Sequence, residues 1–217
     1  MSNEFLITMS MRNPFWNRQN VYNCVNEELK ILKRLEHPNI IWLQEIINDP
    51  KCEHIYLVTE YHSRGSLSDQ VAKLNTNMDA YNKLCKKEGR IKDMKTVGLK
   101  PSKVREYLID MIQALYYCHK IIGLIHRDIN PDNIMVNHND EAVLINFGLS
   151  AIVEETKQIL LDRKMGSYMF FAPEMFACKN GETSSQAGSF NKELSMKHGE
   201  KTDIWALGIT IYYLLTG

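Results

Sequence analysis

Glycine and lysine are absent from the start of this 217-residue chain. None of its 11 glycines precedes Gly65, and its first lysine is Lys30. A glycine-rich loop lets the backbone approach a phosphate without a clash of Cβ atoms. The first 64 residues therefore contain no such loop. They also offer no lysine to a phosphate before position 30, which restricts how the chain could hold a phosphorylated ligand.

The chain also lacks an excess of charge and a long apolar run. Lysine plus arginine and aspartate plus glutamate each number 26, so the composition predicts no attraction to nucleic acid or to an anionic membrane. The longest apolar stretch, residues 204–215, is shorter than the roughly 20 residues of a membrane span and favours a buried core helix. The apolar run at residues 5–7 is too short for a signal peptide. We expect a cytoplasmic or nuclear protein that binds neither nucleic acid nor membranes.

Cysteine is sparse and scattered. The five cysteines are far apart and form neither a CxxC motif nor a Cys/His pair that could chelate zinc. They are Cys24, Cys52, Cys85, Cys118 and Cys178. This spacing indicates reduced thiols.

Helical and strand patterns alternate in the first 62 residues. Apolar residues recur at helical spacing over 22–36, and His37-Pro38 ends that helix. Glu28 falls on the same apolar stripe. Two β-like runs, 40–47 and 55–59, are separated by a turn and predict an antiparallel pair.

The remainder is predicted to be mostly helical. We expect a helix plus a solvated insertion over 71–100 and a long helix from an N-cap at Ser102 to about residue 120. The runs 134–136 and 142–145 predict a β-hairpin, and the polar stretch 177–201 predicts an exposed loop. This order favours a two-lobed α+β fold with a cleft between the lobes.

Three short motifs in the second half carry the chemistry. In chain order they are His126-Arg127-Asp128 with Asn133, then Asn146-Phe147-Gly148, then Ala172-Pro173-Glu174. Together they resemble the HRD…N catalytic loop, the DFG position and the APE motif of protein kinases. The resemblance extends outwards. Residues 28–32 with 37–40 resemble the family's αC helix and the strand that follows it, 55–61 its hinge strand, and 203–208 the start of its αF helix.

The resemblance implies a kinase fold with two partial lobes. The N-lobe would be 1–62, beginning after its glycine loop, and the C-lobe would be 63–217, ending within αF. The run 166–174 is closer to serine/threonine than to tyrosine kinases. The turn at 48–50 and the stretch 149–151 are similar to calcium/calmodulin-dependent protein kinase kinases.

Kinase chemistry assigns roles by resemblance. Asp128 would accept the proton of a substrate hydroxyl, and Asn133 would hold one Mg²⁺. Thr59 would be the gatekeeper of the adenine pocket, with backbone groups of Glu60 and His62 hydrogen-bonding the adenine. The hydrophobic spine that stacks the lobes would be Leu32, Leu43, His126 and Phe147. ATP, Mg²⁺ and a protein substrate or partner are the ligands implied, and the oligomeric state is left open.

Three positions depart from the family pattern. Asn146 replaces the DFG aspartate, so a metal held by Asn133 and Asn146 would lose a negative ligand. Asn130, predicted to lie in the catalytic loop, replaces its lysine, and Thr8 aligns with the strand lysine. A lost electrostatic contact of this kind costs about 2.7–4 kcal/mol in transition-state stabilisation.

These departures leave three functions open. The chain is a catalytically impaired kinase or pseudokinase, a weakly active kinase with unusual nucleotide binding, or a non-functional gene fragment. Asp128 either acts in catalysis or braces its loop. Glu28 lacks its family partner, so either Arg12 or Arg18 pairs with it or the helix turns it to water. Ser167 in the activation segment is expected to be a solvated loop serine.

Overall fold

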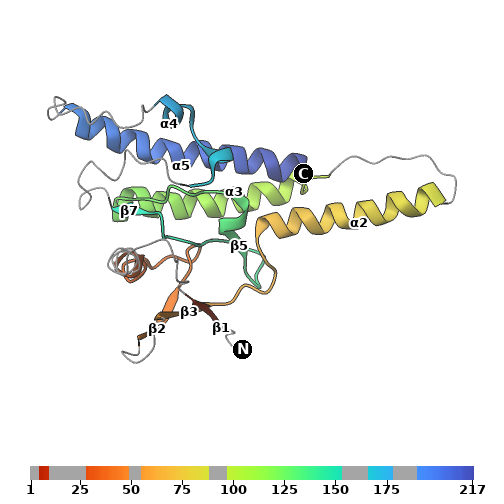
Figure 1. The fold of residues 1–217 in the computed structure, drawn as a ribbon, viewed down its shortest axis with the longest axis horizontal. Coiled ribbons are helices and arrows are strands. Elements are labelled where there is room, and N and C mark those ends of the chain that lie inside the picture. The colour runs from red at the N-terminus through yellow and green to blue at the C-terminus, as the bar shows by residue number, and fades with distance from the viewer. Residues whose placement is uncertain (1–4, 10–27, 49–54, 88–96, 153–165, 178–189) are drawn as a thin grey trace, which may run out of the picture.

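The computed structural model describes residues 5–9, 28–48, 55–87, 97–152, 166–177 and 190–217, which form a small sheet and a larger helical lobe (Figure 1). The strands are β1 (Phe5–Met9), β2 (Leu43–Asn48), β3 (Ile55–Glu60), β4 (Leu124–Ile125), β5 (Ile134–Val136), β6 (Ala142–Leu144) and β7 (Ala151–Ile152). The helices are α2 (Leu67–Lys87), α3 (Pro101–Tyr116), α4 (Pro173–Ala177) and α5 (Phe190–Thr216). There are also a short π-helix, η1 (Tyr117–Ile122), and two 3₁₀ turns, η2 (Pro131–Asn133) and η4 (Tyr168–Phe170). The predicted two-lobed α+β fold is confirmed.

The N-lobe is an antiparallel sheet of order β1-β3-β2. The predicted strand pair is therefore confirmed, but its first strand begins at Leu43 and not at residue 40. The chain before it pairs with the other lobe: Ile41 N donates to Leu144 O at 2.9 Å, and Leu144 N donates to Asn39 O at 2.8 Å. Of the predicted helix, residues 28–32 are helical, and residues 22–27 lie outside the described part.

The helix α2 begins on a reciprocal cap that sequence analysis overlooked. Asp69 N donates to Ser66 Oγ at 3.1 Å, while Ser66 N donates to Asp69 Oδ2 at 2.8 Å. This pair satisfies backbone donors at the helix start, as a capping box does. The helix runs to Lys87, and residues 88–96 of the predicted insertion lie outside the described part.

The helix α3 starts differently from the prediction. Ser102 is not its N-cap: Lys100 takes that position without a side-chain cap, and Pro101 is the first helical residue. Proline suits that place because its missing N–H would have no partner there anyway. The helical backbone then continues as the π-helix η1. This helix ends at Gly123, whose φ of 72° is left-handed.

The prediction of a loop over 177–201 is wrong from Phe190 onward. The helix α5 begins there, because residues 190–201 carry good helix formers although their apolar periodicity is weak. Residues 178–189 lie outside the described part. In Figure 1 this helix lies beside α3 across the top of the molecule.

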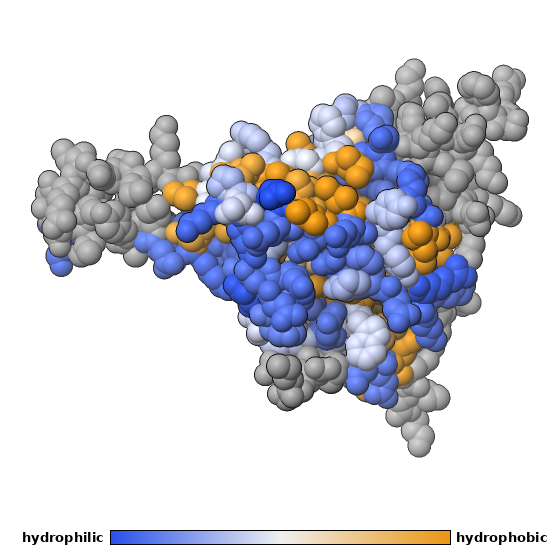
Figure 2. Space-filling view, turned by 180° about the vertical axis from the view of Figure 1, so that it is seen from behind, coloured by the Kyte–Doolittle hydropathy of each residue, from blue (hydrophilic) through white to orange (hydrophobic). Residues whose placement is uncertain are grey.

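The expected burial of residues 204–215 is only half right. Leu207 and Leu214 are buried, whereas Trp205 is 46% and Tyr212 68% exposed. Figure 2 shows apolar residues gathered on the upper part of the back face. No helix in the described residues is both long and apolar enough to cross a membrane. Among the described cysteines, Cys118 is a buried free thiol, and burial raises its pKa to about 12.

Candidate active site

The catalytic loop is fastened to α5 by one buried carboxylate. Asp203 is 1% exposed, and its oxygens accept from His126 N at 2.9 Å and Arg127 N at 2.8 Å. His119 Nε2 lies 2.8 Å from the same carboxylate. The helix therefore holds the loop in the left-handed turn at Arg127, whose φ is 69°.

The imidazole of His126 uses both its nitrogens. Nε2 donates to Ile145 O at 3.0 Å, and Nδ1 accepts from Asp128 N at 3.3 Å. Its ring meets Phe147 edge-on, with centroids 4.9 Å apart. The other two predicted spine residues lie in the same core, Leu32 buried and Leu43 partly buried. Complete burial lowers the pKa of His126, which keeps the ring neutral.

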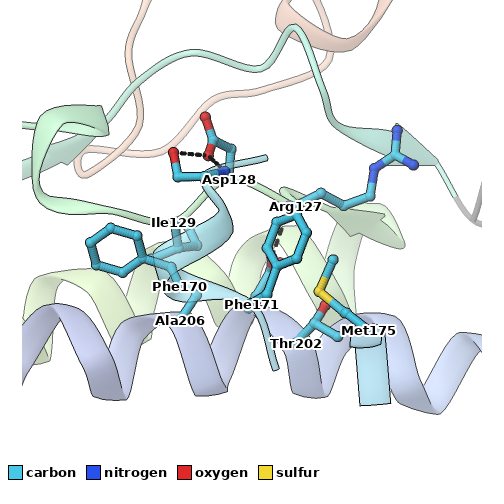
Figure 3. Close-up of a pocket in the computed structure, with 10 residues that line it drawn as sticks. Arg127, Asp128, Ile129, Phe170, Phe171, Met175, Thr202 and Ala206 are labelled. Carbon is cyan, nitrogen blue, oxygen red and sulfur yellow. Dashed lines mark hydrogen bonds between the residues drawn. The ribbon is translucent and has the colours of Figure 1, made fainter. Parts of the chain in front are cut away.

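The carboxylate of Asp128 is surrounded by donors of its own chain. Its Oδ1 accepts from Asn130 Nδ2 at 3.0 Å, and from Ser167 N and Oγ at 2.8 and 2.9 Å. Its Oδ2 accepts from Asn133 Nδ2 at 2.7 Å. Figure 3 shows hydrogen bonds at Asp128 as dashed lines. The structure thus brings the three predicted catalytic residues together and adds Ser167.

The expectation that Ser167 is only a solvated loop serine is wrong, because its N–H and its Oγ both donate to Asp128. A serine in a loop carries no sequence signal of such a contact. The one hint in the sequence of a close approach was the neighbouring glycine, Gly166. Its φ in the structure is 109°. A Cβ atom there would run into Arg127 O. The glycine therefore lets the activation segment approach the catalytic loop, and this approach places Ser167 on Asp128.

Asn130 has a structural role at the position where the family carries lysine. Its Oδ1 accepts from Asp132 N at 3.0 Å and Asn133 N at 3.1 Å, which caps the turn η2. Its Nδ2 contacts Asp128 and Ser167 Oγ. The amide folds into the loop and supplies no positive charge for a phosphate.

The two predicted metal ligands, Asn133 and Asn146, form a hydrogen bond with each other. Asn146 Nδ2 donates to Asn133 Oδ1 at 3.0 Å. Asn146 has a left-handed φ of 65°, which asparagine tolerates. Among the described residues, no group of three His, Cys, Asp or Glu side chains could hold a metal ion. Asn133 Oδ1 already accepts a hydrogen bond, and position 146 has no carboxylate. The side chains of Asn133 and Asn146 therefore do not fit Mg²⁺.

Glu28 lies against the same segment. A Cβ atom at Gly148 would be 3.3 Å from Glu28 Oε2, and the Glu28 side chain is half-buried. Glu28 is therefore not turned fully to water. None of the described residues forms an ion pair with it, and Arg12 and Arg18 lie outside the described part. Burial raises the pKa of Glu28.

We expect Glu28→Gln to stabilise the protein at pH 7 and to leave its stability unchanged near pH 4. The stability linked to the raised pKa is fully present below the usual value of 4.5 and is lost as pH rises through the raised value. Glutamine is neutral throughout and avoids this loss. Urea unfolding at both pH values measures the difference. The exposed Glu45→Gln on β2 is the control, and an equal effect of Glu28→Gln at both pH values would contradict the expectation.

The residues predicted to contact adenine lie on or just after β3 of the N-lobe sheet. Thr59 is buried on β3, and Thr8 on β1 pairs with Leu57 of β3 in the backbone register. Glu60 Oε1 accepts from Trp42 N at 3.1 Å. His62 is buried, and its Nε2 has no hydrogen-bond partner among the described residues. No hydrogen bond found in the described part joins this group to the catalytic loop, so its adenine contacts stay a prediction.

A small cavity lies beneath the catalytic loop. It is lined by Asp128, Ile129, Phe170, Phe171 and Ala206, among others, and its volume is about 10 Å³. Figure 3 shows the two phenylalanines packed between the loop and α5. Such a volume accommodates about one water molecule and no substrate.

Comparison with known proteins agrees with this fold and site. A model of the protein kinase domain matches residues 12–217. The chain is 32% identical over 204 residues to the serine/threonine-protein kinase TOS3 of Saccharomyces cerevisiae (strain YJM789), covering 89% of this chain and 31% of that protein. It is 31% identical over 219 residues to the serine/threonine-protein kinase ssp1 of Schizosaccharomyces pombe, covering 98% and 28%. The chain belongs to the protein kinase family, as a domain of the serine/threonine type.

These comparisons also set limits. The chain spans about a third of the length of the curated relatives it matches. The family match begins at residue 12, after Thr8, so the alignment of Thr8 with the strand lysine stays a prediction. The finer resemblance to calcium/calmodulin-dependent protein kinase kinases also stays a prediction.

Proposed function

We propose that this chain is a catalytically impaired serine/threonine-kinase domain that acts through binding to a protein partner. The observation that supports this most is the hydrogen bond between Asn146 and Asn133, at the position where the family holds a metal between the nucleotide and the protein. Metal ions there neutralise the charge that develops on the transferred phosphoryl group. A pair of neutral amides supplies no such charge.

Asn130 supports the same proposal. Its amide caps η2 and contacts Asp128, so the loop keeps its shape without the lysine that would face the γ-phosphate. Asp128 then serves as a brace for the loop and for Ser167. The nucleotide contacts proposed for Thr59, Glu60 and His62 would be weak without these charges.

A phosphate-transfer assay tests the proposal. Purified protein is mixed with labelled ATP, Mg²⁺ or Mn²⁺ and a generic basic protein substrate. We expect no transfer that depends on Asp128, so the wild type and Asp128→Ala give the same background. Transfer by the wild type that disappears in Asp128→Ala would contradict the proposal, provided both proteins show the same circular dichroism spectrum.

A weakly active kinase is the second candidate. It is favoured by Asp128, which already accepts a hydrogen bond from a hydroxyl group, Ser167 Oγ, at 2.9 Å. Contact at this distance is what a general base requires. This candidate predicts that ATP with Mg²⁺ raises the melting temperature, because a ligand of the native state stabilises it. The gene-fragment alternative predicts instead a broad, non-cooperative transition.

A further inference from the structure

We propose that the amide N–H of Asn146 takes the place of the metal ion, so that the protein closes its active site without a divalent cation. In the family, the cation lies between oxygen ligands of the catalytic loop and of the DFG aspartate. Here the donor of Asn146 meets Asn133 Oδ1 directly, at 3.0 Å. The inference deepens the proposed function and rests on it for the identity of the site, but its test measures stability and not phosphate transfer.

The orientation of Asn133 follows from its other partners. Its Nδ2 donates to Asp128 O at 2.8 Å and to Asp128 Oδ2 at 2.7 Å. Both atoms accept hydrogen bonds only, since one is a carbonyl oxygen and the other a carboxylate oxygen. The amide nitrogen of Asn133 must therefore face Asp128, which leaves its Oδ1 facing Asn146. Asn133 is 8% exposed, so water has little access to that oxygen.

This orientation decides which side chain fits at position 146. An amide can present its N–H₂ group to Asn133 Oδ1 and satisfy it. A carboxylate would present an oxygen to an oxygen, and two acceptors that face each other repel unless a cation bridges them. Asn133 is buried but the side chain at position 146 is exposed, so a cation could reach this place. Asn146 removes the need for a cation, because one end of its own side chain is a donor.

The backbone at Asn146 permits a clean comparison of variants. Its φ of 65° is left-handed. Asparagine and aspartate both tolerate this region, and glycine enters it freely. Asn146→Asp therefore exchanges donor for acceptor without new backbone strain, and Asn146→Gly removes the side chain without strain.

The experiment compares melting temperatures in EDTA and in millimolar MgCl₂, with ionic strength matched by KCl. We expect the wild type to melt at the same temperature in both buffers. Asn146→Asp should melt several degrees lower in EDTA and recover most of that loss in Mg²⁺, as expected for a cation that binds only the native state. The melting temperature of Asn146→Gly should be lowered equally in both buffers. The exposed Asn77→Asp on α2 is the control for an added carboxylate and should show no response.

Two results would overturn the inference. One is a wild-type melting temperature that rises with Mg²⁺ beyond the change in the control. The other is an Asn146→Asp protein that does not respond to Mg²⁺, whether it is folded in both buffers or unfolded in both while Asn146→Gly folds. An active kinase whose melting does not depend on Mg²⁺ would contradict the proposed function and leave this inference standing.

Discussion

Replacing Asp203 with alanine is expected to lower the free energy of unfolding by about 3–5 kcal/mol, the range measured when one partner of a buried charged contact is removed. Asp203 is 1% exposed and accepts from His126 N and Arg127 N, with His119 Nε2 also within 2.8 Å. Alanine would remove the acceptor that these donors share, and each buried group left unsatisfied costs about 1–3 kcal/mol.

Urea unfolding measures this loss. Asp132→Ala is the control, because Asp132 is an exposed acid of the same loop and its removal should change stability by about 0.5 kcal/mol or less. If Asp203→Ala does not fold, Asp203→Asn, which keeps one acceptor oxygen, should fold with reduced stability. A loss below about 1 kcal/mol for Asp203→Ala would show that α5 does not hold the loop.

Gly166→Ala is expected to destabilise the protein by about 2–6 kcal/mol, since strained backbone and steric overlap each cost about 1–3 kcal/mol. The φ of 109° at Gly166 is unfavourable for any residue with a Cβ atom, and that atom would overlap Arg127 O. The activation segment would have to move away, which would withdraw Ser167 from Asp128. Denaturant unfolding measures the change in stability.

A second glycine provides the matched control. Gly208 lies within α5, and a Cβ atom there meets no described atom within 4 Å. Gly208→Ala should therefore stabilise the protein, by up to about 1 kcal/mol, through helix propensity. Equal effects of the two substitutions would contradict the tight approach of the activation segment to the catalytic loop.

The sequence predicted the fold well where motifs or strong periodicity exist. The kinase motifs located Asp128, Asn133 and Asn146, and the structure places the first two in direct contact. The strand pair and the hairpin followed from runs of apolar residues between turns. The start of α5 was missed, because helix propensity in a polar segment leaves no periodic pattern to detect.

The contacts inside the site could not be predicted from the sequence. Asparagine at positions 130 and 146 indicated that a charged side chain is missing at each. The sequence did not indicate which contacts the two amides make. What each amide does instead depends on neighbours that the fold brings together, Asn133 for Asn146 and the start of η2 for Asn130. Ser167 reaches Asp128 across 39 residues of chain, a contact set by the left-handed backbone at Gly166.

The most direct test of the central claim, that the active site closes on its own amides, is a crystal structure of the wild type grown with ATP and Mn²⁺ in place of Mg²⁺. Anomalous scattering identifies Mn²⁺ independently of the protein. We expect no anomalous peak at the site and an unbroken contact between Asn146 Nδ2 and Asn133 Oδ1, at 3.0 Å in the present structure. A peak within coordination distance of the Oδ1 atoms of both asparagines would contradict the account.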